Sequence, residues 1–443
     1  MVQAITCFDR QGISTIEQLN RTTIGKFQIQ KLIGEGATAS VYLAHDAFNG
    51  DKVAIKIANQ GVFEDPVHGQ RFRKMFMNEA SLAGKLRHPH IATVLDAGSE
   101  NSYQYIVMEY VPGDTLKAHC KPETLLPVDD ILEIIFKCCN ALDYAHQQGL
   151  IHRDIKPANL LFTEGTDVKI SDFGTALMMD SDLTQIMDVV GTPNYMPPEQ
   201  VNGGKVTIQS DIYSLGVVMY QLLSGKLPFQ ANNQFDLIHK ITSEAPPALD
   251  SVRSGLPPEV AQIVSRCLEK NPSERYITCS DLATDIARVH EKLLPAQSSA
   301  SDSQKFNTLK TLRFFNSFTD TELWEIIRIS KWHRFSAGTI LLNEGKIGGS
   351  LFILASGEAR IMKNDKFLGL VETGHCFGEM AYISGQKKPR SASVISDTKV
   401  TVLKIKNEAL QKASDPLQTK FNKELLHTMA QRLEKTSLMA TVL

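Results

Sequence analysis

The sequence has few of the features that mark secreted, zinc-stabilised or nucleic-acid-binding proteins. Its seven cysteines are scattered and none forms a C-x-x-C pair, so the sequence indicates neither a disulfide framework nor a zinc site. We interpret them as small buried residues in a reducing compartment. The formal net charge is −2, without a block of like charge, and gives no support for a nucleic-acid partner or a basic membrane anchor.

Apolar runs long enough to enter a membrane are also lacking. Residues 1–20 do not combine a basic start with an apolar run, as a signal peptide does. The longest apolar candidate, residues 212–223, is short and contains Ser214, Gly216 and Gln221, which suits a buried helix. The sequence therefore predicts a cytoplasmic protein with no membrane partner.

The length of 443 residues predicts more than one domain. Residues 27–57 and 92–109 contain the alternating patterns of strand pairs, whereas helical spacing is present at 71–86 and dominates 128–293. Strands followed by helices favour an α+β domain, in which a small sheet lobe and a larger helical lobe enclose a cleft.

A second domain is predicted after a polar, serine-rich run at residues 294–304, which cannot build a core. Short strands alternate with glycine turns between residues 338 and 405, which favours a small barrel or jelly roll, and helical patterns flank this region at 320–329 and 417–438. The expected parts are an N-terminal extension at 1–26, a first domain at 27–293, a linker at 294–305 and a second domain with a C-terminal helix at 306–443.

The most informative motif reads His-Arg-Asp-Ile-Lys-Pro-Ala-Asn at residues 152–159 and is followed by Asp-Phe-Gly at residues 172–174. Phosphoryl transfer needs one carboxylate to orient an attacking hydroxyl, and further oxygens to hold magnesium on the ATP phosphates. Either motif alone could be an ordinary loop with acidic residues. Together, and in this order, they resemble the catalytic loop and the magnesium loop of eukaryotic-type protein kinases.

The resemblance implies a role for each polar residue of these loops. Asp154 is expected to accept the proton of the substrate hydroxyl, and Asn159 and Asp172 are expected to bind Mg²⁺. Lys156, two residues after the aspartate, resembles the lysine that serine/threonine kinases have at this position, and would stabilise the transferred phosphoryl group. The implied substrates are therefore serine and threonine residues of proteins.

An ATP site is implied by two preceding motifs. Residues 34–41 resemble the glycine-rich loop that covers the phosphates of ATP, with Ala39 in place of the third glycine. A lysine in the middle of the strand Val-Ala-Ile-Lys, residues 53–56, is costly to bury without a partner, and the resemblance offers it the phosphates and Glu79. The implied ATP-binding residues are Gly34, Gly36, Val41, Ala54, Lys56, Glu109 and Val111.

Further residues resemble the parts that hold such an enzyme in its active form. Glu199 is expected to form a structural ion pair with Arg275, and Asp211 is expected to anchor the catalytic loop.

Arg153 stands directly before the catalytic aspartate and needs an anion in the active state. Phosphorylated Ser181 or Thr184 in the activation segment is expected to provide that anion. The alternative is that these two residues are ordinary loop hydroxyls.

A second resemblance lies in Phe-Gly-Glu-Met-Ala at residues 377–381 and Pro-Arg-Ser-Ala-Ser-Val at residues 389–394. They resemble the phosphate-binding cassette of cyclic nucleotide-binding domains, where backbone amides and an arginine bind the cyclic phosphate and a glutamate takes the ribose 2′-hydroxyl. The alternative is a degenerate cassette kept as an interaction surface. The implied binding residues are Gly378, Glu379, Ala381, Arg390, Ser391, Thr436 and Ser437.

The identity of the nucleotide depends on the C-terminal helix. A serine directly after the cassette arginine occurs in cyclic GMP-binding domains and in the catabolite activator family, which binds cyclic AMP. Residues 429–437 resemble the long dimer helix of that activator, in which a Thr-Ser pair reaches the adenine amino group, so cyclic AMP is preferred over cyclic GMP. The apolar face of the same helix favours a homodimer. The alternative is that this face packs on the barrel, which would give the same sequence pattern.

We therefore expect an α+β protein in which a bilobal protein kinase fold precedes a β jelly-roll cyclic nucleotide-binding domain with flanking helices. The expected activity is transfer of the ATP γ-phosphate to protein serine or threonine, with Mg²⁺, under control of the cyclic nucleotide. The sequence Asn-Tyr-Met-Pro-Pro-Glu in the activation segment and the resemblance of the C-terminal helix to the catabolite activator favour a bacterial source. Two alternatives are a pseudokinase scaffold and a constitutive kinase whose barrel binds a partner.

Overall fold

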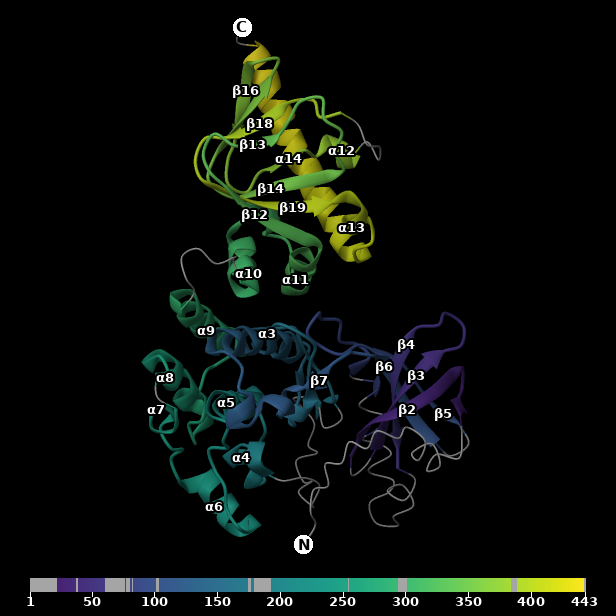
Figure 1. Cartoon of the computed structure of the whole chain (residues 1–443), viewed down its shortest axis with the longest axis vertical. Helices are drawn as coiled ribbons and strands as arrows, with labels where there is room; N and C mark the ends of the chain where they lie inside the picture. Colours follow the sequence, from purple (N-terminus) through teal and green to yellow (C-terminus); the bar gives the residue numbers. More distant parts are fainter. Residues whose placement is uncertain are drawn as a thin grey trace. The chain divides into compact units, whose positions relative to one another are not determined.

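The computed structural model describes most of the chain. The described residues are 22–36, 39–59, 76, 80–81, 83–100, 103–173, 177–178, 193–253, 255–293, 301–383 and 389–441. The chain divides into two compact units, Met1–Leu294 and Pro295–Leu443, and each is described by itself (Figure 1). The helices and strands of the two units confirm the predicted α+β class.

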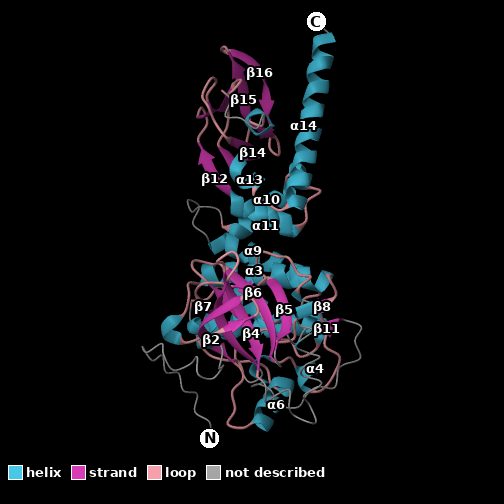
Figure 2. Ribbon diagram, turned by 90° about the vertical axis from the view of Figure 1, so that its right-hand side faces the viewer, coloured by secondary structure: helices cyan, strands magenta, loops and turns pink. Residues whose placement is uncertain are grey.

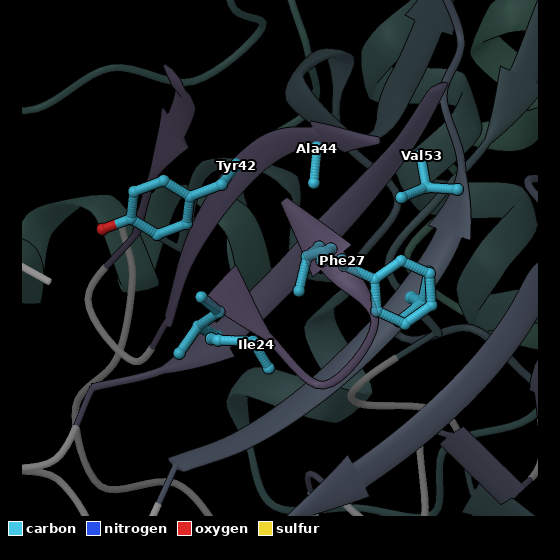
Figure 3. Packing of buried hydrophobic residues seen from close by; sticks show 8 residues of the cluster. Ile24, Phe27, Tyr42, Ala44 and Val53 are labelled. Atoms are coloured by element: carbon cyan, nitrogen blue, oxygen red, sulfur yellow. The ribbon is translucent and has the colours of Figure 1, made fainter. Parts of the chain in front are cut away.

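An antiparallel sheet begins the N-terminal unit, with its described strands in the order β1-β2-β3-β4-β6-β5. Alternate apolar side chains of these strands turn to one face, where Ile24, Phe27, Tyr42, Ala44 and Val53 form part of a buried cluster (Figure 3). The strands are β1 (Thr23–Ile24), β2 (Phe27–Glu35), β3 (Ala39–Asp46), β4 (Lys52–Ala58), β5 (Val94–Glu100) and β6 (Tyr103–Glu109).

Helices dominate the remainder of this unit (Figure 2). Helix α3 is buried around its whole circumference between Ile131 and Leu142, as suits a helix at the centre of a lobe. Gly216 lets α5 approach α8 closely, because a β-carbon there would lie only 2.5 Å from Cβ of Cys267. The helices are α3 (Val128–Gln147), α4 (Pro198–Val201), α5 (Ile208–Ser224), α6 (Gln234–Ser243), α7 (Leu249–Val252), α8 (Pro258–Cys267) and α9 (Cys279–Leu293).

Short strands between α3 and α4 carry the loops of the predicted active site. The antiparallel pair of β9 and β10 places the residue before β9 beside the residues after β10, because Leu160 is opposite Ile170 in the register. These strands are β8 (Leu150–Ile151), β9 (Leu160–Phe162), β10 (Val168–Ile170) and β11 (Leu177–Met178), and β7 (Asp114–Thr115), which precedes α3, pairs with β9.

The C-terminal end of the predicted linker range overlaps a helix. Residues 294–300 lie outside the described residues, but helix α10 (Asp302–Thr311) begins inside the expected linker range of 294–305. A capping box starts this helix: the Ser301 side chain accepts from the backbone N–H of Gln304, and the Gln304 side chain accepts from the backbone N–H of Ser301. Serine-rich composition had favoured a coil where a capping signal starts a helix.

The C-terminal unit is built on two antiparallel sheets, whose described strands lie in the orders β12-β19-β14-β17 and β13-β18-β15-β16. Phe352, Leu354 and Val402 of the first sheet pack with Ala359 and Val394 of the second in one buried cluster, which is the core expected of a jelly roll. The strands are β12 (Ser330–Phe335), β13 (Ile340–Leu342), β14 (Ser350–Ser356), β15 (Ala359–Lys363), β16 (Lys366–Val371), β17 (Cys376–Phe377), β18 (Ser393–Ser396) and β19 (Val400–Lys406).

Helices flank this barrel, as predicted (Figure 1). Besides α10 they are α11 (Asp320–Ile329), α12 (Met380–Ile383), α13 (Asn407–Gln411) and α14 (Asp415–Thr441). Across the described parts of both units, no helix is at once long and apolar enough to cross a bilayer.

Candidate functional site

The loop at residues 152–159 is held from below by a buried carboxylate. Asp211 is fully buried in α5 and accepts hydrogen bonds from the backbone N–H of His152 (2.9 Å), the backbone N–H of Arg153 (2.8 Å) and Nε2 of His146 (2.8 Å). Burial favours the neutral acid, but these hydrogen bonds outweigh it and the pKa of Asp211 lies below its ordinary value. They also hold Arg153 at φ 71°, a conformation that costs a non-glycine residue free energy.

Three polar side chains of this loop converge. Nζ of Lys156 lies 2.7 Å from Oδ2 of Asp154, and the amide nitrogen of Asn159 donates to the same oxygen (3.0 Å) and to the backbone carbonyl of Asp154 (2.8 Å). Asn159 lies in a 3₁₀ turn, Pro157–Asn159, directly before β9. Because its amide nitrogen faces Asp154, the amide oxygen of Asn159 is the atom left to bind a cation.

A lysine and an aspartate from distant parts of the chain meet beside this loop. Lys56 and Ala54 are two residues apart in β4 and therefore share one face of the sheet. Nζ of Lys56 lies 2.5 Å from Oδ1 of Asp172, which follows β10 at φ 63°. Its surroundings favour the neutral acid, but the Lys56 ammonium outweighs them and lowers the pKa of Asp172. The carboxylate is thus ionised, as a metal ligand must be.

Hydrogen bonds join the two loops. The backbone carbonyl of Asn159 accepts from the backbone N–H of Ser171 (2.9 Å) and from its hydroxyl (3.2 Å). Asn159 and Asp172 therefore belong to two backbone segments that are hydrogen-bonded to each other. Carboxylate and amide oxygens are the ligands that Mg²⁺ prefers, so the residues present fit this metal.

Most of the expected ATP-binding residues lie on neighbouring strands, while Gly36 and Val111 follow the ends of β2 and β6. Gly34 is opposite Val41 at the turn of β2 and β3, and Ala54 is opposite Met108 in the pairing of β4 with β6. Ala54 and Met108 are buried in a cluster on one face of the sheet. Gly36 donates its backbone N–H to Ala39 (2.9 Å), although residues 37–38 of this turn lie outside the described residues.

Glu109, the last residue of β6, makes a contact that the sequence did not reveal. The Glu109 carboxylate accepts from Nζ of Lys169 (2.8 and 3.0 Å) and from the backbone N–H of Thr93 (2.7 Å). Lys169 belongs to β10, the strand that leads to Asp172, so the pair connects the small lobe with the magnesium loop. The available signal was a lysine between Val168 and Ile170 in a short apolar strand.

Several predicted residues fall outside the described part of the chain: Glu79, Ser181 and Thr184. Arg153, whose charge was expected to need a phosphorylated partner, is described. Nothing among the described residues forms a hydrogen bond with its buried Nε. Burial lowers the pKa of the Arg153 guanidinium, and nearby Asp211 opposes this shift.

The predicted ion pair between Glu199 and Arg275 is confirmed. The guanidinium is 1% exposed and binds both carboxylate oxygens at 2.8 and 2.9 Å. Burial would raise the pKa of Glu199, but the hydrogen bonds and charge of Arg275 outweigh it and hold this pKa below its ordinary value.

We expect Arg275→Met to destabilise the N-terminal unit by about 3 kcal/mol, because it leaves the mostly buried Glu199 carboxylate without its partner. Denaturant unfolding provides the measurement. Arg288→Met is the matched control, because the Arg288 side chain is 65% exposed beside Asp285 and should cost less than about 1 kcal/mol. Equal losses in the two variants would contradict the prediction. The contribution of the buried pair should be lost as the pH falls through the lowered pKa of Glu199.

In the C-terminal unit, Arg390 is buried beside two close backbone segments. Its guanidinium donates to the backbone carbonyls of Gly378 and Ser350, each at 2.7 Å. Gly378 has φ 76°, and a β-carbon there would lie 2.8 Å from Nη1 of Arg390. A β-carbon at Gly348 would lie 2.7 Å from Nη2, so both glycines make room for the guanidinium. The sequence predicted Gly378 for this place but not Gly348.

The charge of Arg390 has no carboxylate partner among the described residues. Its two hydrogen bonds end on neutral carbonyls, and no ion pair to it is formed in the described part of the unit. Burial lowers the pKa of Arg390, while the charge of nearby Glu379 opposes this shift. A buried guanidinium without a neutralising carboxylate suits an anionic ligand such as a cyclic phosphate.

The remaining cassette residues are partly described. Glu379 follows Gly378 and pairs with Arg432 of α14, while Ser391 is exposed. Helix α12 contains Ala381, and α14 contains Thr436 and Ser437. The side chains of these three residues lie outside the described part of the structure.

Comparison with known proteins matches both units to families. The protein kinase domain matches residues 27–285, more than half of the chain. The cyclic nucleotide-binding domain matches residues 332–415.

Bacterial serine/threonine-protein kinases are similar to the first of these regions. PrkC of Bacillus subtilis is 37% identical over 263 residues, which cover 59% of this chain and 40% of PrkC. The probable kinase PknB of Lactococcus lactis is 35% identical over 272 residues, covering 61% and 43%. PksC of Streptomyces coelicolor is 38% identical over 276 residues, covering 60% and 49%. The chain thus spans less than half the length of these relatives.

Proposed function

The chain belongs to the protein kinase family and carries a cyclic nucleotide-binding domain, and from this premise we propose that it is a serine/threonine protein kinase regulated by a cyclic nucleotide. The observation that carries the proposal is the convergence of Asp154, Lys156 and Asn159 beside the pair of Lys56 and Asp172. These residues come from three separate segments, and their polar atoms meet as phosphoryl transfer requires.

Each residue has a distinct role in the proposed reaction. Asp154 orients the substrate hydroxyl and accepts its proton, and Lys156, 2.7 Å away, stabilises charge on the transferred phosphoryl group. Lys56 holds the phosphates of ATP. Asn159 and Asp172 would bind Mg²⁺, which supplies charge neutralisation to those phosphates.

The serine/threonine specificity has two supports. Lys156 matches the residue that serine/threonine kinases have in this loop, and the relatives named above are serine/threonine-protein kinases. The adenine ring would lie between the side chains of Val41 and Ala54 on one side and the backbone of Glu109 and Val111 on the other. Glu109 would contribute its backbone, because its side chain is already bound to Lys169.

We propose cyclic AMP, rather than cyclic GMP, as the regulatory ligand. Arg390 would bind the cyclic phosphate and Glu379 the ribose, while the Thr436-Ser437 pair of α14 would recognise the adenine. The same helix is proposed to pair with a second copy of the chain, in support of which Leu426 is 65% exposed on α14. Sedimentation that detects only monomers with and without nucleotide would reject this pairing.

The central experiment follows transfer of labelled γ-phosphate from ATP to protein serine and threonine while each cyclic nucleotide is titrated. Calorimetry measures binding in parallel. Transfer that changes with bound nucleotide supports the proposal. Transfer without nucleotide binding favours a constitutive kinase whose barrel binds a partner, and nucleotide binding without transfer favours a pseudokinase scaffold.

We expect the active protein to carry phosphate on Thr184 or Ser181, because the buried Nε of Arg153 needs an anionic partner. Replacing both residues by Ala should lower activity about tenfold or more, since a hydrogen bond to a charged group contributes about 1.5–3 kcal/mol. Mass spectrometry and activity assays provide the measurement. In an Arg153→Ala background the same double change should cost little. Full activity without phosphate at either residue would contradict the prediction.

A further inference from the structure

One asparagine side chain contacts both strands of the hairpin formed by β2 and β3. Asn59 directly follows the end of β4. Its amide nitrogen donates to the backbone carbonyl of Gly36 (3.3 Å), and its amide oxygen accepts from the hydroxyl of Ser40 (3.3 Å). Gly36 directly follows β2 and Ser40 belongs to β3, so this side chain joins the strand that enters the glycine-rich turn to the strand that leaves it.

The strand register places Asn59 at the level of this turn. Ala58, the residue before it, is opposite Ala39 of β3. The backbone N–H of Gly36 donates to the carbonyl of the same Ala39 (2.9 Å), and a β-carbon on Gly36 would lie only 3.2 Å from that oxygen. The strand that leads to Asn59 therefore ends beside the two residues that close the turn.

The same strand carries the lysine that is proposed to hold the ATP phosphates. Lys56 is opposite Val41 of β3, and Val41 is opposite Gly34 of β2. One row across three strands thus contains the lysine and a glycine of the loop. Asn59 lies farther along the chain from Lys56, toward the turn, so the phosphates and the contacts of Asn59 belong to the same end of the sheet.

The direction of the Gly36 carbonyl matters for an anionic ligand. Glycine-rich loops bind phosphates through backbone N–H groups, and glycine allows the neighbouring peptide groups to turn easily. A carbonyl oxygen that turned toward the phosphates would bring two negative groups together and weaken binding. This carbonyl can only accept, so the amide of Asn59 must present its nitrogen to Gly36 and its oxygen to Ser40.

We propose that Asn59 is a positioning residue for ATP, which holds the Gly36 carbonyl away from the phosphates and joins the two strands of the hairpin beside them. This inference rests on the proposed binding of the ATP phosphates by Lys56 and the glycine-rich loop. It adds a residue that belongs to none of the motifs from which the ATP site was predicted.

The test measures three affinities by calorimetry on the full chain: those for a non-hydrolysable ATP analogue with Mg²⁺, for ADP with Mg²⁺ and for adenosine. Asn59→Ala should weaken binding of the ATP analogue by about three- to tenfold, as expected for one hydrogen bond, and binding of adenosine by less than about twofold. The loss for ADP should lie between these two, because ADP carries fewer negative charges. A residue that only stabilised the fold would weaken all three ligands alike.

Two substitutions separate the contacts of Asn59. Asn59→Asp keeps an acceptor for the Ser40 hydroxyl but loses the donor to the Gly36 carbonyl. It should therefore weaken binding of the ATP analogue at least as much as Asn59→Ala does. Ser40→Ala removes only the contact with the hydroxyl, and should change the affinity for the ATP analogue by less than about twofold.

Asn49→Ala is the matched control. Asn49 lies in the turn at the other end of β3 and β4, where its side chain is hydrogen-bonded to Asp51. This variant removes an asparagine from the same pair of strands but not from the glycine-rich turn. All three affinities should stay unchanged.

Each contrary result has a separate meaning. Equal losses for the ATP analogue and adenosine in the Asn59 variants overturn the positioning role, and so does an unchanged affinity for the ATP analogue. A loss in Ser40→Ala as large as that in Asn59→Ala overturns the role of the Gly36 carbonyl. These results leave the proposed function standing. Failure of the unsubstituted protein to bind the ATP analogue overturns the proposed function and this inference with it.

Discussion

Asp154→Asn is expected to lower the rate of phosphoryl transfer to serine or threonine by about 10²–10⁴-fold, the usual contribution of a general acid–base residue. Binding of Mg²⁺ with ATP should stay within about threefold, because Asp154 addresses the acceptor hydroxyl and the proposed metal ligands are Asn159 and Asp172. The asparagine keeps one oxygen, so Lys156 and Asn159 retain an acceptor in place of Oδ2. Single-turnover transfer and nucleotide titration separate the two effects.

Two variants serve as comparisons for this result. Lys56→Met should also inactivate the protein, but through misplaced phosphates, because Lys56 is the cation beside Asp172. Asp285→Asn removes a carboxylate from the surface of α9, where it pairs with Arg288, and should leave transfer unchanged. Near-normal autophosphorylation by Asp154→Asn or by Lys56→Met would show that the assigned roles are wrong.

The sequence predicted best what lies within one loop or one strand pair. Asp154 and Asn159 are five residues apart, so a tight turn brings them together, and their spacing carries this information. Lys56 and Asp172 are 116 residues apart, and their ion pair was not predicted, because the resemblance offered Lys56 only the phosphates and Glu79 as partners. The pair of Glu199 and Arg275 was predicted from the resemblance to the kinase family and is confirmed.

Contacts without such a motif were not predicted. Neither Lys169 nor Arg432 has a local pattern that reveals its partner, because Glu109 is 60 residues before the lysine and Glu379 is 53 residues before the arginine. Gly348 lies among the glycine turns expected between residues 338 and 405, and nothing in the sequence near it shows that an arginine 42 residues later needs the space. The start of α10 differs, because the residues of its capping box are visible in the sequence but stand in a serine-rich run whose composition favours a coil.

Arg390→Ala is expected to weaken cyclic nucleotide binding by about 1.5–3 kcal/mol, the usual contribution of a hydrogen bond to a charged group. The loss should be similar for cyclic AMP and cyclic GMP, because both carry the same cyclic phosphate. Arg390→Lys keeps the charge but not the geometry that reaches the carbonyls of Gly378 and Ser350. The nucleotide affinity of this variant should therefore lie between those of the unsubstituted protein and Arg390→Ala. Calorimetric titration of each nucleotide measures these differences.

The matched control for Arg390 is Arg360→Ala, which removes an arginine from the same barrel. Arg360 pairs with Asp397 and its side chain is 43% exposed, so nucleotide affinity should not change. Arg390→Ala should also blunt the response of kinase activity to nucleotide, because a ligand shifts a conformational equilibrium only by its difference in affinity for the two states. Full affinity in Arg390→Ala would place the ligand elsewhere. Lost affinity with an unchanged activity response would show that the barrel binds nucleotide without controlling the kinase.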